Sequence, residues 1–160
     1  MNPRDVVYFI LKYAIWIGVI VGGFYAIRHT KSVRTDSTDD TAHPYEGGHP
    51  YWLQAETPTS ANLAVNIAVA YHQPDQIDRD RIAWVAATEG QRISIIKRTD
   101  REGFVVMVDG KEGQFQPATI KNEMAEIRVP KGCVFLLARG PVKDSLEFGP
   151  IPLRYVFGKL

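Results

Sequence analysis

A lysine occupies an unexpected position in the apolar stretch ISIIKR, which runs from Ile93 to Arg98. Side chains of an extended chain point alternately to opposite faces, so Lys97 shares a face with Ile93 and Ile95. Three interpretations fit this placement. The lysine lies at a strand end with its ammonium group in water, or it pairs with a buried carboxylate, or it is kept from water as a neutral amine that acts as a base.

A lysine base needs a nucleophile, and serine is its usual partner in a Ser–Lys dyad, where the amine takes the hydroxyl proton. The hydroxyl-rich segment TPTSANL, from Thr57 to Leu63, offers Ser60 just before an apolar run. A segment of this composition is also typical of an ordinary loop. The residue types alone therefore indicate hydrolysis by Ser60 and Lys97 as a hypothesis that needs further support.

Metal and cofactor chemistry has less support in the sequence. The tripeptide His-Pro-Tyr occurs at residues 43–45 and again at 49–51, with Glu46 between the two copies. Two histidines and a carboxylate are possible metal ligands, but a Pro/Gly turn with two exposed histidines explains the same residues. The single cysteine, Cys133, has no histidine at a suggestive spacing and is interpreted as a small packing residue. We expect no metal and no cofactor.

The composition fits one modest domain with an additional segment. The chain has 160 residues, of which 45% are hydrophobic, and a formal net charge of +1. A nucleic-acid partner usually requires a basic excess, so we expect none. A single cysteine excludes an internal disulfide.

The additional segment lies at the N-terminus, where Val6 to Ile27 is apolar and carries Lys12 as its only charge. As a helix this stretch spans roughly 33 Å, enough for a bilayer core of about 30 Å. We expect residues 1–28 to form an uncleaved transmembrane anchor, and a cleaved signal peptide is the alternative. Basic residues flank both ends almost equally, so charge alone leaves the orientation open.

The remainder divides into a polar linker, residues 29–50, and a β-rich part, residues 51–160. Short runs rich in Val, Ile and aromatic residues are separated by Gly, Pro and Asp, which is typical of strands and turns. The pair Asp109-Gly110 predicts a tight hairpin. The fold class is therefore mainly β, a compact antiparallel sheet or small barrel behind one N-terminal helix. The expected strands are Leu63–Tyr71, Arg81–Ala86, Arg92–Arg98, Phe104–Val108, Glu126–Val129 and Cys133–Ala138.

The C-terminal stretch VPKGCVFLLARGPVKDSLEFGPIPLRYVFGKL, from Val129 to Leu160, resembles the end of type I signal peptidases. That family ends with a Val-Pro-x-Gly-x-x-Phe turn and strand, an Asp-Ser, a Gly-Pro-Val-Pro and a hydrophobic-x-Gly-Lys close. RDRIAW, Arg79 to Trp84, resembles the family's Gly-Asp-x-Val-x-Phe strand, and IIKRTDREGFVVMVDGK, Ile95 to Lys111, resembles its lysine box. The resemblance covers about residues 53–160 and implies a fold of the signal-peptidase type.

This resemblance implies a membrane-anchored serine endopeptidase that cleaves exported precursor polypeptides. Its partners would be the lipid bilayer and those precursors, with the soluble domain on the outer face of a bacterial inner (cytoplasmic) membrane. Lys97 falls on the family's general base, and Ser60 would be the nucleophile. Thr57 or Thr59 would help to hold the oxyanion, and the site would be supported by Asp144 and Ser145.

Two alignments of the nucleophile segment remain open, because the family's Ser-Met-x-Pro string is absent here. If Ser60-Ala61-Asn62 matches Ser-Met-Pro, as in the conjugative-transfer branch of the family, the nucleophile is present. If Pro58-Thr59 matches the box's Pro-Thr, the serine position falls on Ala55, and the chain is a catalytically inactive homologue that binds or scaffolds other proteins. Ala138-Arg139-Gly140, where the family has Gly-Asp-Asn, also fits the second alternative.

Overall fold

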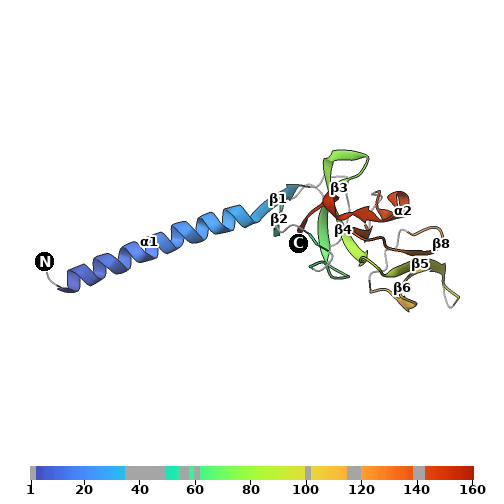
Figure 1. Cartoon of the computed structure of the whole chain (residues 1–160), viewed down its shortest axis with the longest axis horizontal. Helices are drawn as coiled ribbons and strands as arrows, with labels where there is room; N and C mark the ends of the chain where they lie inside the picture. The colour runs from blue at the N-terminus through green and yellow to red at the C-terminus, as the bar shows by residue number, and fades with distance from the viewer. Residues whose placement is uncertain are drawn as a thin grey trace.

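A computed structural model describes residues 3–34, 50–54, 58–59, 62–99, 102–114, 120–138 and 143–160. These residues form one long N-terminal helix followed by two antiparallel β-sheets (Figure 1). The fold is thus mainly β behind one apolar helix, as the sequence predicted. The elements are α1 (Pro3–His29), β1 (Thr30–Arg34), β2 (Pro50–Gln54), β3 (Ala68–Gln73), β4 (Gln76–Ala87), β5 (Arg92–Lys97), β6 (Phe104–Val108), β7 (Lys111–Glu112), β8 (Met124–Arg128), β9 (Cys133–Leu137), α2 (Ser145–Phe148), β10 (Ile151–Pro152), the 3-10 helix η1 (Leu153–Tyr155) and β11 (Val156–Lys159).

The helix α1 carries the apolar stretch that the sequence marked as an anchor. Val6–Ala26 has a mean hydropathy of 1.9 and none of it is buried against the rest of the chain. In length and composition this helix is able to cross a membrane. It runs directly into β1, so the first strand begins where the apolar helix ends (Figure 1).

The larger sheet has seven strands in the order β1-β2-β11-β3-β4-β9-β10. The last strand, β11, lies between β2 and β3 and is antiparallel to each. The backbone N–H of Leu160 donates to the carbonyl of Ala68 at 3.0 Å, which fixes the end of the chain to the start of β3. The C-terminal residues are therefore an interior part of the sheet.

The smaller sheet has four strands in the order β7-β6-β5-β8. The expected hairpin at Asp109-Gly110 is confirmed, because Val108 pairs with Lys111 across the two turn residues. Asp109 and Gly110 have φ angles of 50° and 76°, the left-handed values that a type I′ turn requires. The Asp109 carboxylate also accepts the backbone N–H of Arg92 at 2.8 Å, which joins the turn to β5.

The core follows from the alternation of side chains along β9, which is apolar at every position. Val134 and Leu136 pack into a cluster on one face of the large sheet. Phe135 and Leu137 point to the other face and pack against Ile93 of the small sheet. Both faces of β9 are buried, which explains its unbroken apolar sequence.

One expected strand begins later than its sequence indicates. The run Leu63–Tyr71 is apolar throughout, but β3 starts only at Ala68. Val65 and Asn66 form a turn, and Asn66 has a left-handed φ of 69° that a strand cannot contain. Leu63 is nevertheless buried, because it packs into the cluster with Val134 from outside the sheet.

Candidate functional site

Lys97 is the last residue of β5 and lies opposite Phe104 of β6. Its neighbours on the same face of the strand, Ile93 and Ile95, are 0% and 1% exposed, whereas the Lys97 side chain is exposed. The backbone N–H of Lys97 donates to Glu123 Oε1 at 3.0 Å. The apolar face of β5 thus ends at Ile95, and the amine beyond it reaches solvent, as in the strand-end interpretation.

The predicted nucleophile Ser60 and the predicted support residue Thr57 lie outside the described residues. Thr59 is described and is exposed. Its N–H donates to Asn62 Oδ1 at 2.7 Å, and its carbonyl accepts the N–H of Leu63 at 3.2 Å. This turn is fixed to the core by Leu63, which is 6% exposed.

The other two predicted support residues, Asp144 and Ser145, are 4% and 1% exposed. Ser145 Oγ accepts the backbone N–H of Leu136 at 2.8 Å. Asp144 Oδ2 accepts the N–H of Ala138 at 2.8 Å, and its Oδ1 accepts the N–H of Leu146, which caps α2. Both side chains therefore fix the start of α2 to the end of β9.

Burial raises the pKa of Asp144 to about 6, although its hydrogen bonds from the Ala138 and Leu146 N–H groups act in the opposite direction. Desolvation disfavours the charged carboxylate more than the two donors favour it. The nearby Glu147 also raises this pKa.

A buried tyrosine that the sequence did not single out holds the residue before Asp144. Tyr71 is 0% exposed, and its hydroxyl donates to the carbonyl of Lys143 at 2.9 Å. Burial raises the pKa of Tyr71 well above its usual range, so the phenol stays neutral. Only the apolar run containing Tyr71 was visible in the sequence, because the hydrogen bond joins residues far apart in the chain.

A pocket of about 320 Å³ is lined by residues 120–124 and by Leu146 and Glu147. On one side it is lined by residues 120–124, including Glu123, whose carboxylate accepts the Lys97 N–H. On the other side it is lined by Leu146 and Glu147, which follow Ser145 directly. Residues 120–124 match neither a motif nor a strand pattern, so no sequence signal marks them as the lining of a pocket.

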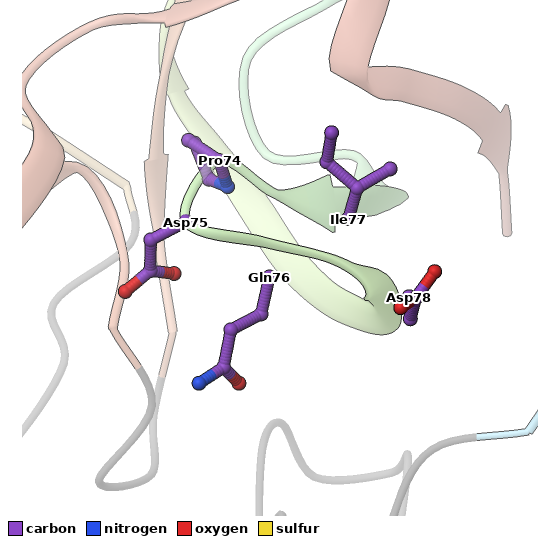
Figure 2. Close-up of a pocket in the computed structure, with 5 residues that line it drawn as sticks. All are labelled: Pro74, Asp75, Gln76, Ile77 and Asp78. Atoms are coloured by element: carbon purple, nitrogen blue, oxygen red, sulfur yellow. The ribbon is translucent and has the colours of Figure 1, made fainter.

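A second hollow, of about 670 Å³, lies over the turn between β3 and β4. Figure 2 shows its lining, which consists of the five consecutive residues 74–78. Asp75 is held there by hydrogen bonds from the side chains of Gln73 and Lys143, which lower its pKa. Because five consecutive residues of the turn and the start of β4 form the whole lining, this hollow does not bring separate segments together.

Metal-ligating groups are not clustered in the part of the chain that the structure describes, where no three His, Cys, Asp or Glu side chains converge. The candidate ligands His43, Glu46 and His49 lie outside the described residues. Cys133 is a free cysteine and is half-buried.

Comparison with known proteins adds no family to this picture. No protein-family model matches the chain, and no curated protein matches it.

Proposed function

We propose that the chain is a membrane-anchored serine endopeptidase of signal-peptidase type that cleaves exported precursor polypeptides. The observation that supports this proposal is that one pocket lies beside two segments of the resemblance, although Lys97, Asp144 and Ser145 do not themselves line it. The backbone N–H of Lys97 donates to the carboxylate of Glu123, which lines the pocket. Leu146, which follows Asp144 and Ser145 in the chain, also lines it. The two segments are far apart in the sequence, and the fold brings them to the same side of the domain as this pocket.

In the proposed reaction, Ser60 attacks the scissile carbonyl carbon and forms an acyl-enzyme. Lys97, as a neutral amine, takes the hydroxyl proton and returns it to the leaving amine. A backbone N–H near Ser60, with the hydroxyl of Thr57 or Thr59, holds the oxyanion. Water then hydrolyses the ester, with Lys97 again acting as the base, and the serine is regenerated.

A second candidate function is a catalytically inactive homologue that binds exported segments at the membrane. The exposed side chain of Lys97 favours it, because a lysine base depends on desolvation to stay neutral. The sequence Ala138-Arg139-Gly140, in place of Gly-Asp-Asn, also favours it.

Cleavage of a model precursor by the purified full chain in proteoliposomes distinguishes these functions. The test compares the parent with Ser60→Ala and Lys97→Met, and each is matched by a control, Ser37→Ala in the linker and Lys131→Met in an exposed turn. We expect both site variants to lose about three decades of rate and both controls to cleave like the parent. A parent chain that cleaves no faster than either site variant would exclude the enzyme.

A further inference from the structure

The pocket of about 320 Å³ has an apolar wall that belongs to the core. Ile120 is 9% exposed and packs in the cluster between the two sheets, and Met124 packs against the same cluster. Across the pocket, Leu146 is 40% exposed although it lies on a helix whose start is firmly held. An apolar side chain from another polypeptide would cover these groups and remove them from water.

The rim of the same pocket is acidic. Two exposed glutamates, Glu123 and Glu147, line it together with a single exposed lysine, Lys121. The ammonium of Lys143 lies 3.9 Å from Glu147 but is closer to Asp75, at 3.1 Å, so it only partly offsets this charge. The surplus carboxylate favours a cationic group beside the apolar one.

The edge of a sheet begins at the pocket. Met124 lines the pocket and is also the first residue of β8, which pairs with β5 on one side. Along its other side no strand of the described residues is paired with it. Free backbone groups on such an edge bind an extended peptide as an added strand.

We propose that this pocket and the edge of β8 together bind an extended polypeptide at a bulky apolar residue that is followed by lysine or arginine. The apolar side chain would lie among Ile120, Met124 and Leu146, and the cation would lie between the two glutamates of the rim. The inference rests on the proposed function for the source of the peptide, which would be an exported precursor.

The test measures binding on the full chain carrying Ser60→Ala, in detergent micelles, so that no probe can be cleaved through the proposed dyad. The probes are three fluorescent octapeptides of alanine and serine with a central Leu-Lys, Ser-Lys or Leu-Glu pair, followed by anisotropy. We expect the Leu-Lys peptide to bind about tenfold more tightly than the Ser-Lys peptide, since it buries one leucine. Its advantage over the Leu-Glu peptide should be several-fold and should shrink at about 1 M salt.

A charge reversal then tests the geometry. Glu147→Lys should reverse the preference so that the Leu-Glu peptide binds more tightly than the Leu-Lys peptide, and Leu146→Ser should weaken both peptides about tenfold. The matched control is Glu102→Lys, an exposed glutamate outside the lining, which should leave the preference unchanged. A merely structural role of Glu147 would not reverse the order of two ligands.

Three results would overturn the inference: equal binding of the three peptides, an equal effect of Glu102→Lys, or a chain dimer that Leu146→Ser dissociates. The last result would make a second copy of the chain the occupant. Because binding is measured on the Ser60→Ala chain, failure to bind would not count against cleavage by the parent. Absence of cleavage by the parent would likewise not count against binding.

Discussion

At the scale of single residues, two buried polar side chains take the place of a strand partner. β10 pairs with β9 only at Cys133 and Val134. Further along the same edge, the N–H groups of Leu136 and Ala138 donate to the side chains of Ser145 and Asp144. A buried N–H without a partner costs about 1–3 kcal/mol, so these contacts explain why the two polar residues are buried.

The buried carboxylate of Asp144 makes folding stability depend on pH. Burial raises its pKa to about 6, above an unfolded value of about 3.9. The folded chain therefore binds this proton more tightly than the unfolded chain does. The resulting contribution to the free energy of unfolding is fully present below about pH 4, and it is lost as the pH rises through about 6. The loss is on the order of 2–3 kcal/mol.

Urea unfolding of the parent and of Asp144→Asn, followed between pH 4 and pH 7, checks this prediction. The stability of the parent relative to the variant should fall with rising pH, because asparagine carries no titrating proton. The reference is Asp78→Asn, which replaces an exposed carboxylate. Asp75 and Asp109 have lowered pKa values and act in the opposite sense, so only the difference between chains is informative. A difference that stays constant with pH would refute the prediction.

At the scale of elements, the last strand depends on a glycine. A Cβ built at Gly158 of β11 would lie 2.9 Å from both Cβ and Cδ1 of Leu53 in β2. Leu53 is 1% exposed and packs with Ala70 and Phe157, so it has little space to move. The close approach of β11 to β2 therefore requires a residue without a side chain.

Replacement of this glycine should weaken the large sheet. Gly158→Ala should lower the free energy of unfolding by about 1–3 kcal/mol, the usual cost of overpacking a core. The matched substitution is Gly22→Ala in α1, where the added methyl group meets nothing within 4 Å. Thermal unfolding of the β domain should change in the first variant alone, and equal melting of the two variants would disprove the packing argument.

The elements that the sequence predicted are those whose pattern is local. Phe104–Val108 forms β6 with the expected bounds, and the Asp109-Gly110 turn follows it because only a few residue types accept its backbone angles. The sequence predicts a linker where the polar strand β1 lies, because its five residues show no alternation of apolar and polar side chains. This strand is defined only by its pairing with β2. The short helix α2 did carry a signal, Asp144 with Glu147 three residues later, which is the pattern of a capping box.

The candidate site was less predictable than the fold. The position of Lys97 at the end of β5 follows from strand periodicity, but its exposure depends on where the core ends. Nothing in residues 120–124 indicates a pocket, because the lining is completed by Leu146 from a distant segment. The pocket is therefore a property of the tertiary fold, which no local sequence pattern predicts.

At the scale of the whole molecule, an apolar helix is joined without a break to a domain with its own core. The cluster of Ile93, Phe135 and Leu137 holds the two sheets together independently of α1. Val6–Ala26, by contrast, is not buried in the protein and is long and apolar enough to cross a membrane. The apolar helix is therefore no part of the core of the β domain.

An uncleaved anchor predicts three properties of the expressed protein. Its intact mass includes residues 1–28, and it stays in the membrane fraction after alkaline carbonate extraction. Protease added to spheroplasts digests residues 50–160. The matched chain carries Ile15→Lys and Ile20→Lys, which interrupt the apolar helix and should release the protein. A mature protein without the first 28 residues would show that the helix is a signal peptide. A domain protected from external protease would contradict the proposed orientation.

If Ser60 is a nucleophile activated by Lys97, the acyl-enzyme can be trapped on Ser60. The full chain is mixed with a peptide ester, quenched with acid within seconds, digested and analysed by mass spectrometry. We expect an added acyl mass on Ser60 in the parent and none in Lys97→Met or Ser60→Ala. A parent chain that turns over the ester with no adduct on Ser60, or that carries the adduct equally without Lys97, would contradict it.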